Sequence, residues 1–250
     1  MPTPLTVIIP TLNESAQIAE CVRHLTWSGE VIVSDGGSSD GTVAAARGAG
    51  ARVIESAATT IAGQRNEAIA VAKHEWVYAL DADERIGIEL ARELAAVVSS
   101  PRHEAYAVRR RNVYLGRTMR YAGWGTDWSV RLFRRERRFV ERRVHEGLVP
   151  VTDVGRLQVP VEHVPYRDLT EPLDKLSRYA AWGAQDLWDG GRRAWVGDLL
   201  VRPPFTFFRT YVLQLGILEG WHGVVLCGLA AVSVFLKYAR LWELQRRVDD

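Results

Sequence analysis

The sequence predicts an α/β protein built on a largely parallel β-sheet. In roughly the first hundred residues, short β-branched runs alternate with segments whose apolar residues recur at helical spacing, which is the pattern of βαβ units. Polar clusters directly follow three of the runs, as expected of a ligand-binding sheet edge. The runs expected to form strands are Thr6–Ile9, Glu30–Ser34, Arg52–Glu55 and Trp76–Leu80.

Three apolar stripes predict the helices that cover this sheet. Their members recur at helical spacing, so each stripe faces one side of a helix. The stripes are Ile18, Val22 and Leu25, then Ile61, Ala68, Ile69 and Ala72, then Leu90, Leu94 and Val97. From 106 to 165 the pattern changes to shorter, more polar extended pieces rich in arginine. We interpret that stretch as a mixed sheet edge on the acceptor side.

The chain is expected to divide into a catalytic domain at 1–168 and a helical region at 169–250. The helical region contains an aromatic-rich segment, Phe205–Tyr211, and a run without charge, Gly223–Leu236. A perpendicular membrane helix needs about 20 apolar residues, so this run favours a helix that lies at a membrane surface or folds into a core. Amphipathic aromatic residues favour the headgroup level of a bilayer. We therefore expect association with a membrane surface.

Composition limits the partners and the compartment only weakly. The net charge of +2 comes from 32 basic and 30 acidic residues, although arginines concentrate between Arg109 and Arg143. Such a segment suits an anionic ligand or membrane, and no nucleic-acid partner is expected. Cys21 and Cys227 lie far apart in sequence and in different contexts, which is not the pattern of a disulfide framework, and the N-terminus lacks a secretory pattern. The prediction is a cytoplasmic protein attached peripherally to the inner face of the cell membrane. The sequence does not indicate an oligomeric state.

The strand ends indicate how a phosphorylated ligand would be held. The chain has neither of the two common glycine-rich phosphate loops, so a divalent metal is the remaining route. Mn²⁺ or Mg²⁺ prefers oxygen ligands, which Asp81 and Asp83 offer after the fourth run. The two-residue period of a strand would point both carboxylates to one side of the crevice. Alternatively, Asp81–Glu84 only caps the helix that begins near Gly87.

Three ordered motifs resemble those of the family-two glycosyltransferases of GT-A fold. They are Val7–Glu14, Val31–Thr42 and Asp81–Glu84. The later stretch Trp124–Arg135, with Val144-His145-Glu146 and the apolar C-terminal helices, is similar to the bacterial branch that contains lipopolysaccharide core β-glucosyltransferases. The resemblance implies a GT-A sheet, a nucleotide-sugar donor and a metal cofactor, Mn²⁺ or Mg²⁺.

The resemblance also implies roles for individual residues. A first group would bind the nucleotide sugar: Pro10, Asn13 and Glu14 in the nucleotide pocket, Asp35 at the uracil or ribose, Arg65 near the donor, and Asp81 with Ala82 at the ribose and donor sugar. A second group, Asp83 and His163, would hold the metal. Simpler roles stay open: Asp35 as a turn residue, Asn13 and Glu14 as helix caps, Arg65 as a solvated helix residue, and His163 as a core residue.

Inversion at the anomeric carbon requires a carboxylate that takes the proton of the acceptor hydroxyl. Relatives carry an acidic pair after the acceptor loop, whereas this chain offers His145-Glu146 and, earlier, Asp127. Glu146 is the preferred base, Asp127 is the second candidate, and Glu146 could instead only pair with an arginine. The expected activity is transfer of a hexose from a nucleotide-diphosphate sugar, with a UDP-hexose as the preferred donor, to a cell-envelope glycan or glycolipid such as lipopolysaccharide core. Two alternatives are a sugar nucleotidyltransferase and a non-catalytic glycan-binding scaffold on the membrane.

Overall fold

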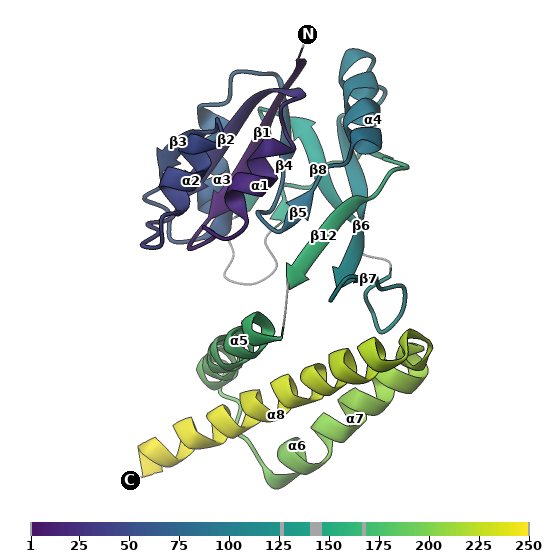
Figure 1. Cartoon of the computed structure of the whole chain (residues 1–250). Coiled ribbons are helices and arrows are strands. Elements are labelled where there is room, and N and C mark those ends of the chain that lie inside the picture. The colour runs from purple at the N-terminus through teal and green to yellow at the C-terminus, as the bar shows by residue number, and fades with distance from the viewer. Residues whose placement is uncertain (1, 126–127, 141–146, 167–168, 250) are drawn as a thin grey trace. The chain divides into compact units, whose positions relative to one another are not determined.

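The computed structural model describes residues 2–125, 128–140, 147–166 and 169–249. The chain forms two compact units, which we call the sheet unit and the helical unit (Figure 1). The sheet unit comprises Met1–Arg111 and Asp127–Val164, and the helical unit comprises Asn112–Thr126 and Pro165–Asp250. The helical unit therefore includes the segment 112–126, which the expected division at residue 168 places in the catalytic domain.

The sheet is mixed, with one parallel part and one antiparallel part. Four strands pair in parallel in the order β3-β2-β1-β4: β3 Arg52–Glu55, β2 Ser28–Asp35, β1 Thr3–Thr11 and β4 Trp76–Ala79. These are the four strands that the β-branched runs predicted. The expectation of a mostly parallel sheet holds only for this part.

Beyond β4 the order continues through β8 Trp128–Arg134, β6 Ala105–Tyr114, β12 Val161–Tyr166 and β5 Glu84–Arg85. The pairs β4–β8, β8–β6 and β12–β5 are antiparallel. Two short strands join β6, namely β7 Arg117–Thr118, which is antiparallel, and β11 Val154–Arg156, which is parallel. A separate hairpin pairs β9 Phe139–Val140 with β10 Gly147–Leu148.

Helices cover both faces of the parallel part because successive strand side chains point to opposite faces. In β1, Val7 and Ile9 belong to one core with α1 Ile18–Arg23 and α4 Ile88–Ser99. Ile8, between them, belongs to a second core with α3 Ile61–Ala70. Helix α2 Thr42–Gly48 contributes Ala46 to the first core. The predicted apolar stripes on α1 and α4 are thus faces that pack on the sheet. The α3 stripe does so except at Ile61, which is 49% exposed.

The helical unit is built around one long helix, α8 Trp221–Asp249. Helix α5 Thr170–Asp189 packs along it through Ala184, which lies in one cluster with Tyr238 and Leu241. Helices α6 Val196–Leu200 and α7 Arg202–Phe208 continue through a π-turn, η1 Arg209–Leu213, and a 3₁₀-turn, η2 Gly216–Glu219. The chain then reverses into α8. We call this antiparallel arrangement of α7, η1 and η2 against α8 the helical hairpin.

Glycine permits the reversal at the end of the hairpin. A Cβ added to Gly223 would collide with the carbonyl oxygen of Gly216, so the two backbones touch there. Within α8, the stretch Trp221–Arg246 is long and apolar enough to cross a membrane, and 22% of its most apolar window is buried. The charge-free run noted in the sequence is therefore part of a longer helix.

Candidate active site

The carboxyl ends of β1 and β2 lie side by side and carry two loops joined by hydrogen bonds. Asp35 ends β2 opposite Thr11, and its carboxylate accepts hydrogen bonds from the Thr11 hydroxyl at 3.2 Å and from the Ser38 backbone N–H at 2.8 Å. It also accepts from the Gly37 N–H at 3.1 Å. Asp35 is 2% exposed, and its carboxylate fixes the turn that follows β2. Asp35 therefore acts as the predicted turn residue. These hydrogen bonds do not test its predicted contact with the uracil or ribose.

Asn13 and Glu14 join the loop after β1 to the loop after β2. The Asn13 side-chain oxygen accepts from the Ser39 N–H at 2.9 Å, and the Asn13 N–H donates to the Ser38 hydroxyl at 2.8 Å. The Glu14 N–H donates to the Thr42 hydroxyl at 2.8 Å. Asn13 has a φ of 58°, in the left-handed region that asparagine tolerates. The N-cap position of α1 is occupied by Gln17, so neither Asn13 nor Glu14 is the N-cap residue of that helix.

Asp40 closes the same loop pair. Its carboxylate accepts from the Thr42 hydroxyl at 2.5 Å and from the Ser15 N–H at 3.1 Å. These bonds, the Thr42 hydroxyl first, lower the pKa of Asp40 to about 2. Pro10, which pairs with Ser34 just before this edge, completes the set that the motifs predicted. The structure thus brings Pro10 and the residues of both loops to one sheet edge.

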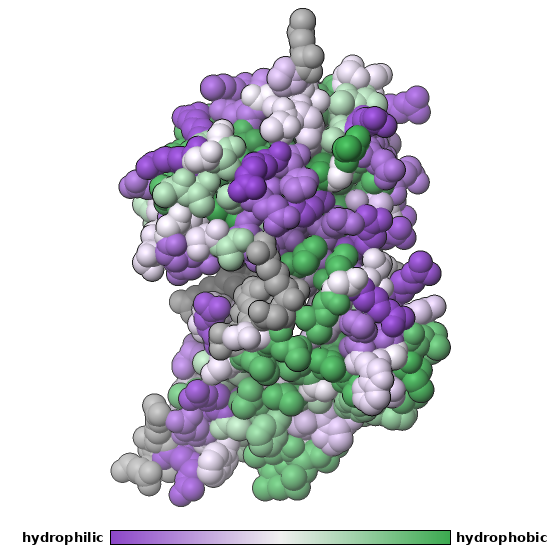
Figure 2. Space-filling view, viewed as in Figure 1, coloured by the Kyte–Doolittle hydropathy of each residue, from purple (hydrophilic) through white to green (hydrophobic). Residues whose placement is uncertain are grey.

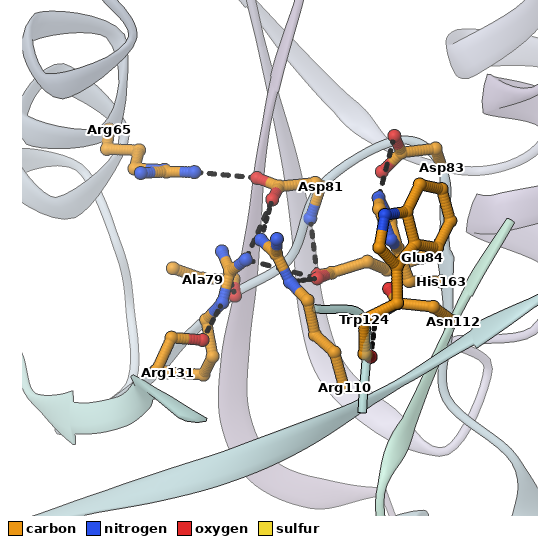
Figure 3. A network of polar contacts seen from close by, with 11 residues as sticks. Arg65, Ala79, Asp81, Asp83, Glu84, Arg110, Asn112, Trp124, Arg131 and His163 are labelled. Atoms are coloured by element: carbon orange, nitrogen blue, oxygen red, sulfur yellow. Dashed lines mark hydrogen bonds and ion pairs between the residues drawn. The ribbon is translucent and has the colours of Figure 1, made fainter. Parts of the chain in front are cut away.

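Asp81 lies at the neighbouring strand end and is surrounded by three arginines (Figure 3). Its Oδ1 is 2.6 Å from Nη2 of Arg65, and its Oδ2 is 3.0 Å from Nη2 of Arg110 and 2.7 Å from Nη2 of Arg131. Burial alone would raise the pKa of Asp81, but Arg131, Arg65 and Arg110 together hold it well below its usual range. The arginine that the motifs indicated, Arg65, therefore contacts the first aspartate of the acidic motif directly.

Glu84 is a second carboxylate in this cluster and is fully buried. Its Oε1 is 2.9 Å from Nε of Arg110 and 3.0 Å from Nη2 of Arg131, and its Oε2 accepts the Asp81 N–H at 3.0 Å. Burial raises the pKa of Glu84, and the nearby Asp81 charge acts in the same direction. Sequence reasoning assigned no role to Glu84, Arg110 or Arg131. Successive side chains of a strand point to opposite faces, so Arg110 is expected to face the other way from Arg109 and Arg111. In the structure Arg109 and Arg111 are exposed and Arg110 is half-buried.

Asp83 turns away from this cluster toward His163 (Figure 3). Its Oδ2 is 3.2 Å from Nε2 of His163, and the Val164 N–H donates to the Asp83 carbonyl at 2.9 Å, which secures β12 beside the motif. Residues 81–83 form a turn closed by the Glu84 N–H donating to the Asp81 carbonyl at 3.0 Å. The prediction that both aspartates point to one side is therefore wrong, because the chain is not extended there and arginines engage Asp81.

The pair of Asp83 and His163 fits a divalent metal. Oδ1 of Asp83 is buried and has no hydrogen-bond partner among the described residues, a state that normally costs free energy. Carboxylate oxygen and imidazole nitrogen both ligate Mn²⁺, and Mg²⁺ often takes one or two carboxylates plus substrate phosphates. In the described part of the chain, no group of three or more His, Cys, Asp or Glu side chains is placed to hold a metal. The remaining ligands would therefore come from elsewhere, as phosphate oxygens do.

A cavity of about 410 Å³ opens beside the arginine cluster within the sheet unit. Arg65, Arg110 and Arg131 line it together with a largely apolar wall that includes Phe139 and 147–151. The Arg65 guanidinium lies over the Phe139 ring, 4.9 Å from its centroid, and Asn66 fixes the Phe139 backbone with two hydrogen bonds. The cavity thus combines cationic and apolar walls, which suits a ligand with both characters. The two candidate bases, Asp127 and Glu146, lie outside the described residues.

The comparison with known families identifies the class of protein that carries this site. A model described as Glycosyl transferase family 2 matches residues 6–155, so the chain belongs to this glycosyltransferase family. The motif resemblance is therefore confirmed, and the fold is a GT-A-like α/β fold with a mixed central sheet. Family membership also decides against the nucleotidyltransferase alternative. The match ends before α5, so it does not describe most of the helical unit.

Relatives extend the likeness over the whole chain. The chain is 28% identical over 264 residues to the lipopolysaccharide core biosynthesis glycosyltransferase LpsC of Rhizobium meliloti, covering 99% of this chain and 97% of the relative. It is 26% identical over 254 residues to an uncharacterized glycosyltransferase of Rickettsia typhi, covering 96% and 87%. The protein is thus a family 2 glycosyltransferase related to an enzyme of lipopolysaccharide core biosynthesis.

Solved structures with partial likeness include glucosyl-3-phosphoglycerate synthase from Mycobacterium tuberculosis. In complex with Mn²⁺, UDP and glucosyl-3-phosphoglycerate, that synthase has 22% sequence identity and a TM-score of 0.36, covering 45% of this chain and 44% of the synthase. Its complex with Mg²⁺ and UDP has 18% identity and a TM-score of 0.37, covering 53% and 56%.

Proposed function

We propose that this glycosyltransferase moves a hexose from a UDP-sugar, with inversion, onto a membrane glycolipid such as lipopolysaccharide core. The observation that carries the proposal is the Asp83–His163 pair, whose buried carboxylate oxygen lacks a partner among the described residues, beside loops joined by Asn13 and Asp35. The near full-length relative in lipopolysaccharide core biosynthesis supports the acceptor class.

On the donor side, Asp83 and His163 would hold Mn²⁺ or Mg²⁺. When bound there, the ion would supply positive charge against the departing diphosphate. Pro10, Asn13, Glu14 and Asp35 would form the nucleotide pocket, with the Asp35 carboxylate facing the uracil or ribose. The hydrogen bonds between the two loops support this assignment, because they fix the pocket before the ligand arrives.

Asp81 and Arg65, with Ala82 in the turn, would face the ribose and the donor sugar. Arg65 and Arg110 hold both Asp81 oxygens in place, so the carboxylate is oriented and ionised across the physiological pH range. A fixed carboxylate is a selective acceptor for sugar hydroxyls, because its geometry need not be organised at the moment of binding. The cavity next to Arg65 is then available for the acceptor.

Inversion requires a single displacement at the anomeric carbon. A carboxylate, Glu146 in the preferred assignment and Asp127 in the alternative, takes the proton of the acceptor hydroxyl. The acceptor oxygen forms the new glycosidic bond as the bond from the anomeric carbon to the diphosphate oxygen breaks. The electron pair of that bond leaves with the UDP.

The helical unit is proposed to attach the enzyme to the cytoplasmic face of the membrane. Large apolar side chains between Trp195 and Trp221 are exposed, and Trp221 reaches 83% exposure. Figure 2 shows a broad hydrophobic surface over the helices of this unit. Burial of such side chains in the headgroup boundary is favourable, at about 1.5–3 kcal/mol for each large apolar side chain.

Charge in the same segment favours an anionic bilayer. Between 190 and 222 the acidic residues are Asp198 and Glu219, and both side chains are buried. Asp198 pairs with Arg192 at 3.2 Å and Arg202 at 2.5 Å, and Glu219 pairs with Arg117 at 3.5 Å. The segment therefore exposes apolar and basic side chains and no carboxylate, which suits anionic headgroups.

We propose docking rather than spanning for α8. Its partner α5 packs along it and carries six charged residues between Thr170 and Asp189. A charge within the hydrocarbon core costs several kcal/mol, roughly 2.5–3.5 for each Arg, Lys or Asp on insertion scales. A helix that packs beside α5 would bring those charges into the bilayer, whereas a docked helix leaves them in water.

A transfer assay tests the proposed activity. The full chain, Mn²⁺ and each of several UDP-hexoses are incubated with rough lipopolysaccharide in mixed vesicles, and UDP release and sugar incorporation are both measured. The proposal expects incorporation from one UDP-hexose, with the product anomer opposite to that of the donor by NMR. Binding of UDP-sugar without turnover would favour the non-catalytic scaffold instead, and a retained anomer would contradict inversion.

A further inference from the structure

A second cavity lies within the helical unit and has a different character from the one beside the arginines. Its volume is about 200 Å³, and its walls come from α5, η1, α8 and the segment 112–126. Trp124 and Leu176 form part of one wall, and Leu226, Ala230 and Ser233 of α8 form another. We call this cavity the apolar pocket.

The exposed wall of the apolar pocket is mostly apolar, and the hydroxyl residues that line it are Tyr114, Tyr179, Thr210 and Ser233. The Thr210 hydroxyl donates within its own helical turn, to the carbonyl of Thr206 at 2.9 Å and to that of Phe207 at 3.2 Å. Cys227, whose thiol pKa is raised by burial, adds only a weak donor. Apolar cavities of about 150 Å³ stay dry and take up small hydrocarbons. A cavity of this size and lining therefore favours a hydrocarbon ligand over water or a sugar.

The apolar pocket lies beside the end of the helical hairpin. Thr210 lines it from one arm and Cys227 from the other, and Cys227 also lies close to Gly216 in the turn. The Ala122 N–H donates to the Gln214 carbonyl at 2.8 Å, so the segment 112–126 is attached to the same turn. The pocket is therefore next to the exposed apolar residues of the hairpin end, including Leu215, Ile217, Leu218 and Trp221.

Glu219 holds the pocket wall against the hairpin. Its buried carboxylate accepts the backbone N–H groups of Arg120 at 2.7 Å and Tyr121 at 3.0 Å, and it pairs with Arg117. The carboxylate thus neutralises one arginine and fixes the loop that leads to Trp124. A surface that carries the exposed Arg120 beside exposed apolar side chains matches a bilayer with anionic headgroups, which favours a bilayer lipid as the source of the hydrocarbon.

We propose that the apolar pocket takes up one hydrocarbon chain of a bilayer lipid. The inference rests on the proposed function in so far as the helical unit reaches the membrane. A chain that leaves the bilayer for this pocket would hold a lipid, and any sugar attached to it, at the enzyme while the bilayer supplies the lipid laterally. The pocket would then select acceptors by their lipid part, independently of the sugar that the sheet unit recognises.

Photolabelling of the full chain tests the proposal. The probe is a phosphatidylglycerol with a diazirine in its acyl chain, in vesicles of phosphatidylethanolamine and phosphatidylglycerol, and adducts are mapped by mass spectrometry. The wild-type chain should carry adducts on residues that line the pocket, such as Trp124 and Ala230, as well as on Trp221 at the exposed end.

Three variants sharpen the test. Ala230→Trp and Ser233→Phe fill the pocket from α8, whereas Val232→Trp places the same indole side chain at a position on α8 that is 45% exposed. Filling should reduce pocket adducts about tenfold, because about two methylene groups of the lipid chain can no longer be buried in the pocket. Adducts at Trp221 should be unchanged. Val232→Trp should label like the wild type. Circular dichroism checks that each variant is folded.

Rough lipopolysaccharide added as a competitor separates two lipid sources. Loss of the pocket adducts assigns the pocket to the glycolipid chain, and their retention assigns it to a phospholipid chain; either result supports a lipid pocket. Adducts confined to the exposed hairpin end in the wild type, or unchanged pocket adducts in both filled variants, would overturn the proposal. Labelling requires no sugar transfer, and UDP-sugar hydrolysis requires no lipid, so this failure is distinct from failure of the proposed activity.

Discussion

Nη2 of Arg131 lies 2.7 Å from Oδ2 of Asp81, which ties β8 to the turn that follows β4. Arg131 is almost wholly buried, and its pKa is raised by the carboxylates of Asp81 and Glu84 even though burial alone would lower it. A buried cation shared by two carboxylates cannot be removed without leaving charge uncompensated. The contact therefore matters for stability as well as for the position of the acidic motif.

The first prediction concerns this buried charge. Arg131→Leu should lower the free energy of unfolding by about 3–5 kcal/mol, because both carboxylates lose a guanidinium partner in a buried site. Arg111→Leu is the matched control, because Arg111 pairs with Glu162 at the surface and should contribute at most about 1 kcal/mol. Urea unfolding followed by circular dichroism measures both. Equal midpoints for the two variants would show that the cluster does not support the fold.

The second prediction is a pH dependence. The pKa of Asp40 is about 2 in the folded chain, below its ordinary value of 3.8, so its stabilising contribution is complete above about pH 4 and is lost as the pH falls toward 2. Asp40→Asn should therefore lower Tm at pH 7, and the difference from the wild type should shrink between pH 4 and pH 2. Glu55→Gln, at an exposed carboxylate, is the control. A difference that grows on acidification would contradict the assignment.

The third prediction assigns the base. Glu146→Gln should lower kcat by about 10²- to 10⁴-fold, the usual contribution of a general base, and should leave UDP-sugar affinity nearly unchanged. Asp127→Asn should retain activity close to that of the wild type. The reverse pattern would transfer the role to Asp127, and full activity of both variants would remove both residues from the mechanism.

The fourth prediction concerns membrane attachment. A double change, Leu218→Glu with Trp221→Glu, should reduce flotation of the full chain with anionic vesicles at least about tenfold, because two exposed apolar side chains lose their burial in the bilayer. Ile88→Glu, at a residue that is 72% exposed in the sheet unit, should float like the wild type. Flotation that is equal for all three proteins would argue against docking through the hairpin end.

The sequence predicted the parallel part of the sheet well because each of its strands is indicated by a short local run of β-branched residues. Three of the four runs of β-branched residues are followed by a predicted helical stripe, and the structure has strands at all four runs. The order of the antiparallel strands could not be predicted in the same way, because β6 and β8 pair with strands that lie far away in the sequence. The same runs could have closed a sheet in several orders, and periodicity does not distinguish them.

The candidate site was predictable in its motifs and less so in its geometry. Asn13 and Asp35 lie together because both follow parallel neighbouring strands, as expected. Asp81 and Asp83 separate because their partners are remote: Arg131 is 50 residues from Asp81, and His163 is 80 residues from Asp83. No local pattern encodes such contacts. The structure therefore adds the arginine cluster, which changes Asp81 from an expected neighbour of the metal into a carboxylate held by cations.

The most direct test of the central claim is calorimetric titration of UDP into the full chain with and without Mn²⁺, in the wild type and in Asp83→Ala. Asp83→Ala removes the unpartnered Oδ1 together with the Oδ2 contact to His163, so the free energy of unfolding should change by about 1 kcal/mol, and circular dichroism checks that the variant is folded. The account predicts UDP binding that requires Mn²⁺ in the wild type and no Mn²⁺-dependent binding in a folded Asp83→Ala variant. Mn²⁺-dependent UDP binding of undiminished affinity in Asp83→Ala would contradict it.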